Sequence, residues 1–210
     1  MGYCCIKPTA SKAKVKTKLQ SLDKLSMLKR FSVNFGYSVF VALAWIGLWY
    51  LNDFLFNAAE VAPLVSLVFL PAILRPMAVL LFGVPGAIGL VLGAAITLPI
   101  IATVSFPILL MIFSNGSVAW AVLVLLRQIP AYRSELTYDM AGLTLRTIIL
   151  FAGLTALAST LTHSLIISLS PDLSSSSGLA LSMLIGDSIG GFLMLYLLSI
   201  LSPIVSKHLR

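Results

Sequence analysis

The feature that most constrains this chain is the length of its uncharged apolar runs. Between Arg75 and Arg127 the sequence contains no Asp, Glu, Lys or Arg. A transmembrane helix needs about 20 mainly apolar residues to cross about 30 Å of hydrocarbon. Hydrophobic residues make up 59% of the chain and charged residues 10%, against about 45–50% and about 25% in soluble domains. A chain of 210 residues cannot hide that much apolar surface from water, so the composition disfavours a soluble enzyme, a disulfide scaffold and a disordered protein.

Six segments are long enough to span a bilayer, so we predict an all-α fold: a polytopic membrane bundle of about six transmembrane helices. The predicted spans are residues 32–54, 63–82, 85–102, 106–126, 143–168 and 179–205. Trp45, Trp49 and Tyr50 lie towards the far end of the first span, where an aromatic belt is expected. The bundle then covers residues 32–205, between a basic tail, 1–31, and a short C-terminus, 206–210.

The distribution of basic residues predicts the orientation of the bundle. Lysines and arginines cluster in the first 30 residues, which contain a single opposing carboxylate, Asp23. With six spans and the N-terminus inside, the remaining basic residues except Arg75 fall on the inner side. The outer loops hold Asp53, Glu60 and Asp172 instead. This is the positive-inside rule, so we expect both termini in the cytoplasm, whereas five spans would place the basic C-terminus outside.

The basic tail is expected to contact the membrane surface. Apolar residues interleave with lysines over residues 19–31 near helical spacing, which predicts a short interfacial helix on anionic lipid rather than a nucleic-acid-binding segment. Both cysteines, Cys4 and Cys5, lie in this tail and are expected to be free thiols. Acylation is the alternative, although Ile6 stands where the myristoylation pattern requires Ser or Thr.

Arg75 and Asp187 are predicted to lie deep in the hydrocarbon. A charge at the bilayer centre costs at least about 2.5–3.5 kcal/mol, so each should face the bundle interior and find a partner. Counted from the outer ends of their spans, their depths differ by roughly 6 Å at about 1.5 Å per residue, which the long arginine side chain can cover. We therefore predict an intramembrane charge pair, which either pins helix register or serves a ligand or proton.

Two further segments carry polar residues within the predicted spans. Thr155, Ser159 and His163 share one face of the fifth span, a polar stripe suited to hydrogen bonds between helices, with a pH sensor at His163 as the alternative. A Ser-Asn-Gly-Ser sequence around Asn115 and Gly116 is expected to interrupt the fourth span, as a cavity lining or as a kink.

Small residues recur at four-residue spacing in the third and sixth spans, which predicts close helix packing. The packing positions are Gly89, Gly93, Gly186 and Gly190. Residues 186–190 also match the serine-hydrolase pattern by letter, but that motif needs a strand-turn-helix elbow and here lies in an apolar helix. Because zinc-ligand clusters, phosphate-cradling loops and haem motifs are also missing from the sequence, we expect no enzyme, no cofactor and no metal.

Several sequence stretches together resemble a known family. Residues 70–83 read Leu-Pro-Ala-Ile-Leu-Arg-Pro-Met-Ala-Val-Leu-Leu-Phe-Gly, and Val-Pro-Gly and Gly-Leu-Val-Leu-Gly follow at 84–86 and 89–93. A late Gly-Asp at 186–187 precedes the final apolar residues, and Arg146 opens the fifth span. Over residues 60–205 this pattern resembles the first-type MASE family of bacterial integral membrane sensor domains. The resemblance implies a sensory bundle in the bacterial inner membrane, usually fused to a histidine kinase or cyclic-di-GMP domain.

Three functions are compatible with these observations. The first is a sensor-like bundle that acts through a separate partner protein, because the sequence ends at Arg210 without an output domain. The second is a structural or accessory subunit of a membrane complex, docked through small-residue stripes or apolar faces. The third is a small-solute or ion carrier whose route is lined by the polar residues named above, although carriers usually offer internal repeats or several polar spans.

Overall fold

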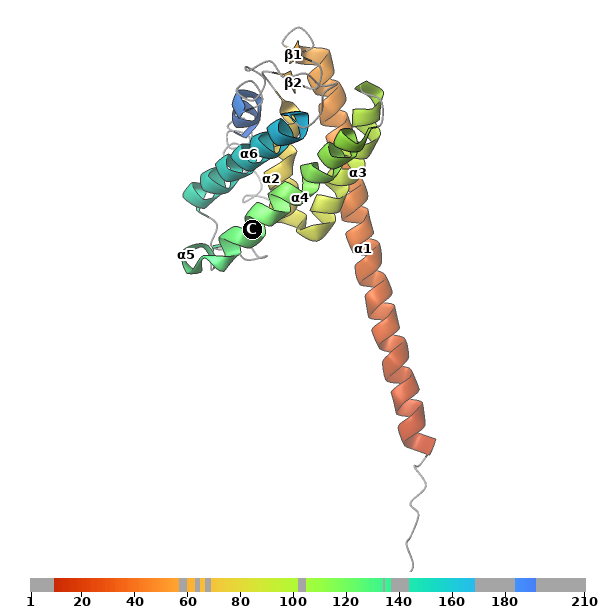
Figure 1. Cartoon of the computed structure of the whole chain (residues 1–210). Coiled ribbons are helices and arrows are strands. Elements are labelled where there is room, and N and C mark those ends of the chain that lie inside the picture. The colour runs from red at the N-terminus through yellow and green to blue at the C-terminus, as the bar shows by residue number, and fades with distance from the viewer. Residues whose placement is uncertain are drawn as a thin grey trace, which may run out of the picture. The chain divides into compact units, whose positions relative to one another are not determined.

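A computed structural model describes residues 10–56, 60–62, 65–66, 69–101, 105–133, 135–136, 144–168 and 184–191. Most of these residues are helical, which confirms the predicted helical fold class (Figure 1). The chain divides into two units, Met1–Gly36 and Tyr37–Arg210. Cys4, Cys5, Asp172, the C-terminus and most of the predicted sixth span lie outside the described residues.

Within the part of the chain that the structure describes, three helices are long and apolar enough to cross a membrane. They are Met27–Leu55 within α1 (Ala10–Phe56), α4 (Phe106–Gln128) and α6 (Leu145–Ser168). They coincide with the first, fourth and fifth predicted spans. The helix that contains the first span, α1, also runs without a break through residues 19–31, where the sequence predicts a separate short helix.

The predicted second span is wrong in its first third. In place of a helix from residue 63, the chain forms a small antiparallel hairpin of β1 (Glu60–Ala62) and β2 (Val65–Ser66). The helix begins only with the 3-10 turn η2 (Leu70–Ile73) and continues as α2 (Leu74–Phe82). Pro71 in the first turn of η2 favours this start, because N–H groups in the first turn of a helix have no partner within the helix, so the N–H that proline lacks is not needed there.

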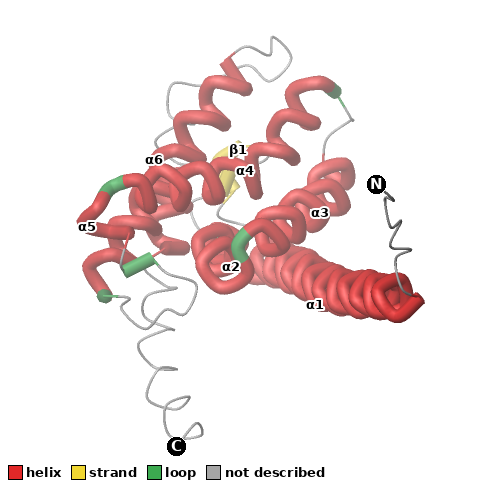
Figure 2. Tube along the Cα trace, turned by 90° about the horizontal axis from the view of Figure 1, so that it is seen from below, coloured by secondary structure: helices red, strands yellow, loops and turns green. Residues whose placement is uncertain are grey.

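A sharp turn joins α2 to α3 (Val84–Ile101), and both helices are shorter than the three long spans. The connecting Gly83 has φ 61°, a conformation that glycine adopts without steric cost. Its N–H donates to the Val79 carbonyl at 2.9 Å, which closes the end of α2. Across the turn, a Cβ at Gly86 would collide with the carbonyl of Ala78. The turn therefore folds α3 back against α2 (Figure 2).

The core of the second unit lies among α2, α3, α4 and α6. α3 packs along α4, and α4 packs along α6. Fully buried side chains at this centre include Val79, Leu90, Ile108, Leu123 and Phe151. The four-residue turn α5 (Pro130–Arg133) follows α4. Large apolar side chains are exposed along every long helix, which is the pattern of a protein whose outer face is solvated by lipid rather than water.

Candidate functional site

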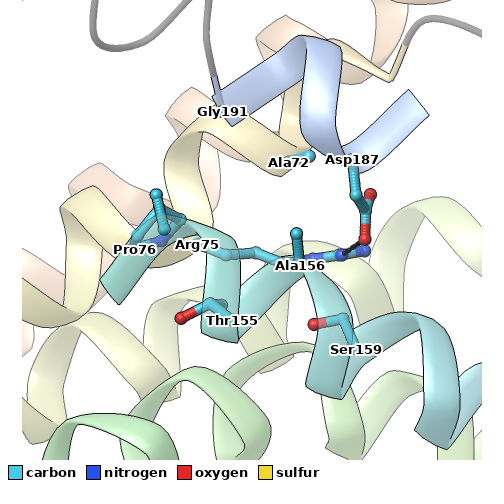
Figure 3. A pocket seen from close by; sticks show the side chains of 9 residues that line it. Ala72, Arg75, Pro76, Thr155, Ala156, Ser159, Asp187 and Gly191 are labelled. Carbon is cyan, nitrogen blue, oxygen red and sulfur yellow. Dashed lines mark hydrogen bonds and ion pairs between the residues drawn. The ribbon is translucent and has the colours of Figure 1, made fainter. Parts of the chain in front are cut away.

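Arg75 and Asp187 meet in the interior, although they are far apart in sequence. Arg75 lies near the start of α2 and is 4% exposed, and Asp187 lies in the helical segment 184–191 and is 8% exposed. The Nη1 atom of Arg75 donates to Oδ2 of Asp187 at 2.8 Å (Figure 3). Each charge therefore has the buried counter-charge that apolar surroundings demand.

Arg75 also contacts α4 and two aromatic rings. Its Nε donates to Oδ1 of Asn115 at 3.2 Å, and Nδ2 of Asn115 donates to the Met111 carbonyl at 2.9 Å, which fixes the orientation of the amide. The guanidinium carbon lies 5.8 Å from the ring centre of Trp45 and 5.4 Å from that of Phe69, within cation–π range. One arginine thus joins α1, α2, α4 and the segment 184–191.

A second polar contact joins α4 to α6. Ser114 Oγ lies 2.9 Å from Nε2 of His163 and 2.8 Å from the Met111 carbonyl. A hydroxyl has one proton, so when Ser114 donates to this carbonyl, Nε2 of His163 must carry the hydrogen and donate to Ser114. His163 then acts as a contact between helices, which is the first of the two roles the sequence allows.

A small cavity adjoins the ion pair. Its volume is about 10 Å³. Nine residues line it: Ala72, Arg75, Pro76, Ala152, Thr155, Ala156, Ser159, Asp187 and Gly191. Figure 3 shows Thr155 and Ser159 on the α6 ribbon beneath the Arg75 side chain, while the Asp187 carboxylate points to the guanidinium from the other side. Two residues of the predicted polar stripe therefore lie beside the predicted charge pair.

The expected interruption of the fourth span is wrong. α4 is helical through the Ser-Asn-Gly-Ser sequence. Hydroxyls from this sequence bond back to carbonyls of the preceding turn, as Ser117 does to Phe113 at 2.9 Å. Gly116 is needed for close packing, because a Cβ there would collide with the Ala87 carbonyl of α3. Asn115 does not line the cavity, but it contacts Arg75, which does.

The glycine stripes pack within the chain itself. A Cβ at Gly89 would lie 2.5 Å from the Ser38 carbonyl, and one at Gly93 would lie 2.7 Å from the Trp45 side chain, so α3 approaches α1 closely. A Cβ at Gly190 would lie 2.8 Å from the Phe69 carbonyl, and Gly186 is buried in the same segment. Gly89, Gly93 and Gly190 are therefore occupied by intramolecular contacts.

Three polar contacts of α1 were not predicted in the sequence analysis. Trp45 Nε1 donates to Thr97 at 3.2 Å, and the Asn52 side chain accepts from the Leu70 N–H at 2.8 Å at the start of η2. Ser38 donates to the Pro85 carbonyl at 2.8 Å. Trp45 stands in the predicted aromatic belt but is 2% exposed. A polar residue on an otherwise apolar helix is the signal that points to such contacts.

A carboxylate connects the end of α5 to the start of α6. Glu135 accepts hydrogen bonds from the hydroxyls of Thr144 and Thr147. These two bonds hold the pKa of Glu135 below its ordinary value, and the bond from Thr147 has the larger effect. The nearby Arg146 acts in the same direction. Arg127 Nε donates to the Leu136 carbonyl at 2.8 Å. This basic loop is the one that the charge distribution assigns to the inner side.

Comparison with known proteins adds no relative: no protein-family model, curated protein or solved structure matches the chain. Among the described residues, no group of three or more His, Cys, Asp and Glu side chains could hold a metal ion. The site is therefore characterised by its own geometry: a buried ion pair, an amide, two hydroxyls and a small cavity.

Proposed function

We propose that this chain is a non-enzymatic membrane protein that works as a sensory bundle and passes its state to a separate partner protein. The observation that supports this most is the position of Arg75, whose side chain contacts three other elements. In this proposal the bundle has six spans in a bacterial inner membrane, with both termini in the cytoplasm. The resemblance to the first-type MASE family points the same way.

A buried ion pair that joins several helices suits signalling, because the packing with Asp187 ionised differs strongly in energy from the packing with Asp187 neutralised or displaced. While Asp187 is ionised, it holds the segment 184–191 to α2. Neutralising or displacing the carboxylate leaves Arg75 buried without its counter-charge, which is costly in a low-dielectric interior. The same arginine also bonds Asn115, so a change at Asp187 is felt in α4. A chemical event at one residue can thereby bias the packing of several helices.

The carrier function has less support from the geometry. Asn115 bonds to Arg75 and to its own helix, and His163 contacts Ser114. The cavity beside Asp187 has a volume of about 10 Å³, the space of a single water. These bonds occupy Arg75, Asp187, Asn115 and His163, which favours contacts between helices over a route for a solute.

The accessory-subunit function remains the second candidate, and it rests on the exposed apolar side chains of the long helices. The glycine stripes do not favour the accessory-subunit function, because they pack within the chain. Basic residues at the tail and around the α5 turn are candidate contacts for anionic lipid or for a cytoplasmic partner in either function.

The test compares cells that carry the wild type, a deletion or Asp187→Asn, with Asp53→Asn as control because Asp53 is an exposed carboxylate on α1. Phosphorylated proteins and cyclic-di-GMP are measured, and the complex is purified in mild detergent. We expect Asp187→Asn to shift these outputs as the deletion does, with the complex intact and the control unchanged.

A wild-type output in Asp187→Asn, together with loss of a complex on deletion, would identify an accessory subunit. Unchanged outputs in every strain, without a stoichiometric partner, would reject both functions.

A further inference from the structure

The cavity beside the ion pair brings two buried charged side chains together with buried hydroxyl groups. It is lined by Arg75 and Asp187, both more than nine-tenths buried, and by two α6 hydroxyls. A cavity needs about 10–15 Å³ and two to four polar partners to hold a water molecule. This cavity has about 10 Å³ and offers a guanidinium, a carboxylate and the hydroxyls of Thr155 and Ser159.

One of these groups requires a partner that the described residues do not supply. Thr155 is 2% exposed, and its Oγ1 has no hydrogen-bond partner among the described residues. A buried hydroxyl without a partner costs about 1–3 kcal/mol. Arg75 has five N–H groups, of which two are used by Asp187 and Asn115. The cavity therefore adjoins the Thr155 hydroxyl, which can both donate and accept a hydrogen bond, and the remaining N–H donors of Arg75.

The charges and the size decide which occupant fits. A bare cation is disfavoured because Arg75 lines the cavity, and an anion is disfavoured because Asp187 does. The cavity is partly open, but the space inside it, about 10 Å³, suits one heavy atom, so a larger organic molecule would have to extend out of it. A neutral group of one heavy atom that both donates and accepts satisfies all of these partners, and water is that group.

We propose that a single water molecule occupies this cavity and bridges the Arg75–Asp187 pair to the Thr155 hydroxyl of α6. The pair is then a hydrated site that joins α6 to α2 and to the segment 184–191. Ser159, one turn further along α6, lies within the same lining and shares the water. This site goes beyond the signalling function and stands whether or not the bundle signals.

The test uses Thr155→Val, which keeps the shape of the side chain and removes the hydroxyl. Thr160→Val is the matched control, because Thr160 is also buried on α6 and its hydroxyl also has no partner among the described residues, but it does not line the cavity. Infrared spectra of the full chain in membranes are recorded in H₂¹⁶O and H₂¹⁸O, since the heavier oxygen lowers the stretching frequency of a bound water. We expect an ¹⁸O-sensitive band in the wild type that disappears in Thr155→Val and persists in Thr160→Val.

A band that survives unchanged in Thr155→Val would overturn the proposal, as would a wild type without any such band. Loss of the band in both variants would also overturn it, because the water would then not be specific to this cavity. A high-resolution density map is the second measurement. A single peak within hydrogen-bond distance of Thr155 and Asp187 supports the site, and a dry cavity or a larger occupant refutes it.

Discussion

At the scale of single residues, Arg75 concentrates more interactions than any other position described above. The side chain is stabilised by Asp187, by Asn115 and by the faces of Trp45 and Phe69. The pairing with Asp187 could be predicted from sequence, because two charges in apolar helices must find each other. The contact with Asn115 could not, because sequence spacing carries no information on how α4 is rotated towards α2.

Removal of one charge should be more harmful than removal of both. Arg75→Met or Asp187→Leu leaves an uncompensated buried charge, and we expect each to lower the free energy of unfolding by about 3–5 kcal/mol. The double variant Arg75→Met/Asp187→Leu should recover most of this loss, because no charge is left. Unfolding in detergent micelles measures all three. A double variant as unstable as the sum of the single variants would show that the two side chains are not coupled.

Glu135 gives a pH-dependent prediction outside the membrane-spanning segments. Its pKa is lowered from 4.5 by the hydroxyls of Thr147 and Thr144, so its bonds stabilise the start of α6 at pH values above 4.5. The stabilisation is lost as the pH falls through the lowered pKa. Amide hydrogen exchange over residues 144–150 should be faster in Glu135→Gln than in the wild type at neutral pH, with the difference vanishing at low pH. A constant difference at every pH would exclude this role.

At the scale of elements, the long helices were predictable and the second span was not. Uncharged apolar runs predict α4 and α6 closely, because length and hydropathy suffice when lipid is the solvent. The run over residues 63–82 is also mainly apolar, with Arg75 as its one charged residue, but local backbone chemistry decides where its helix begins. Pro71 marks that start, and Asn52 from α1 accepts the Leu70 N–H there. A long-range partner of this kind is not visible in a hydropathy pattern.

Two glycines on neighbouring helices should respond oppositely to the same substitution. Gly116→Ala places a Cβ against the Ala87 carbonyl, and overpacking of this kind costs about 1–3 kcal/mol. No described atom lies within 4 Å of a Cβ built at Gly153 on α6, so Gly153→Ala should be neutral or stabilising by up to about 1 kcal/mol through helix propensity. Thermal unfolding of the two variants gives the comparison. Equal stabilities would mean that α3 and α4 are less closely packed than described.

At the scale of the whole molecule, the direction of the chain across the membrane is still a prediction. Reporter enzymes fused after Arg133 and after Arg210 should both report the cytoplasmic side, because the basic residues of the loop and of the C-terminus are retained there. A reporter after Asp53 should report the opposite side. Fusions after Arg133 and Arg210 on different sides would require an odd number of crossings after α4.

The turn at Gly83 has a consequence for this topology. Since α2 and α3 fold back on each other, the chain leaves the pair on the side from which it entered. However deeply this pair of helices enters the membrane, the sidedness of everything downstream is the same. An insertion machinery that reads only the charges flanking each helix can therefore orient α4 and α6 correctly, whatever the depth of the α2–α3 pair.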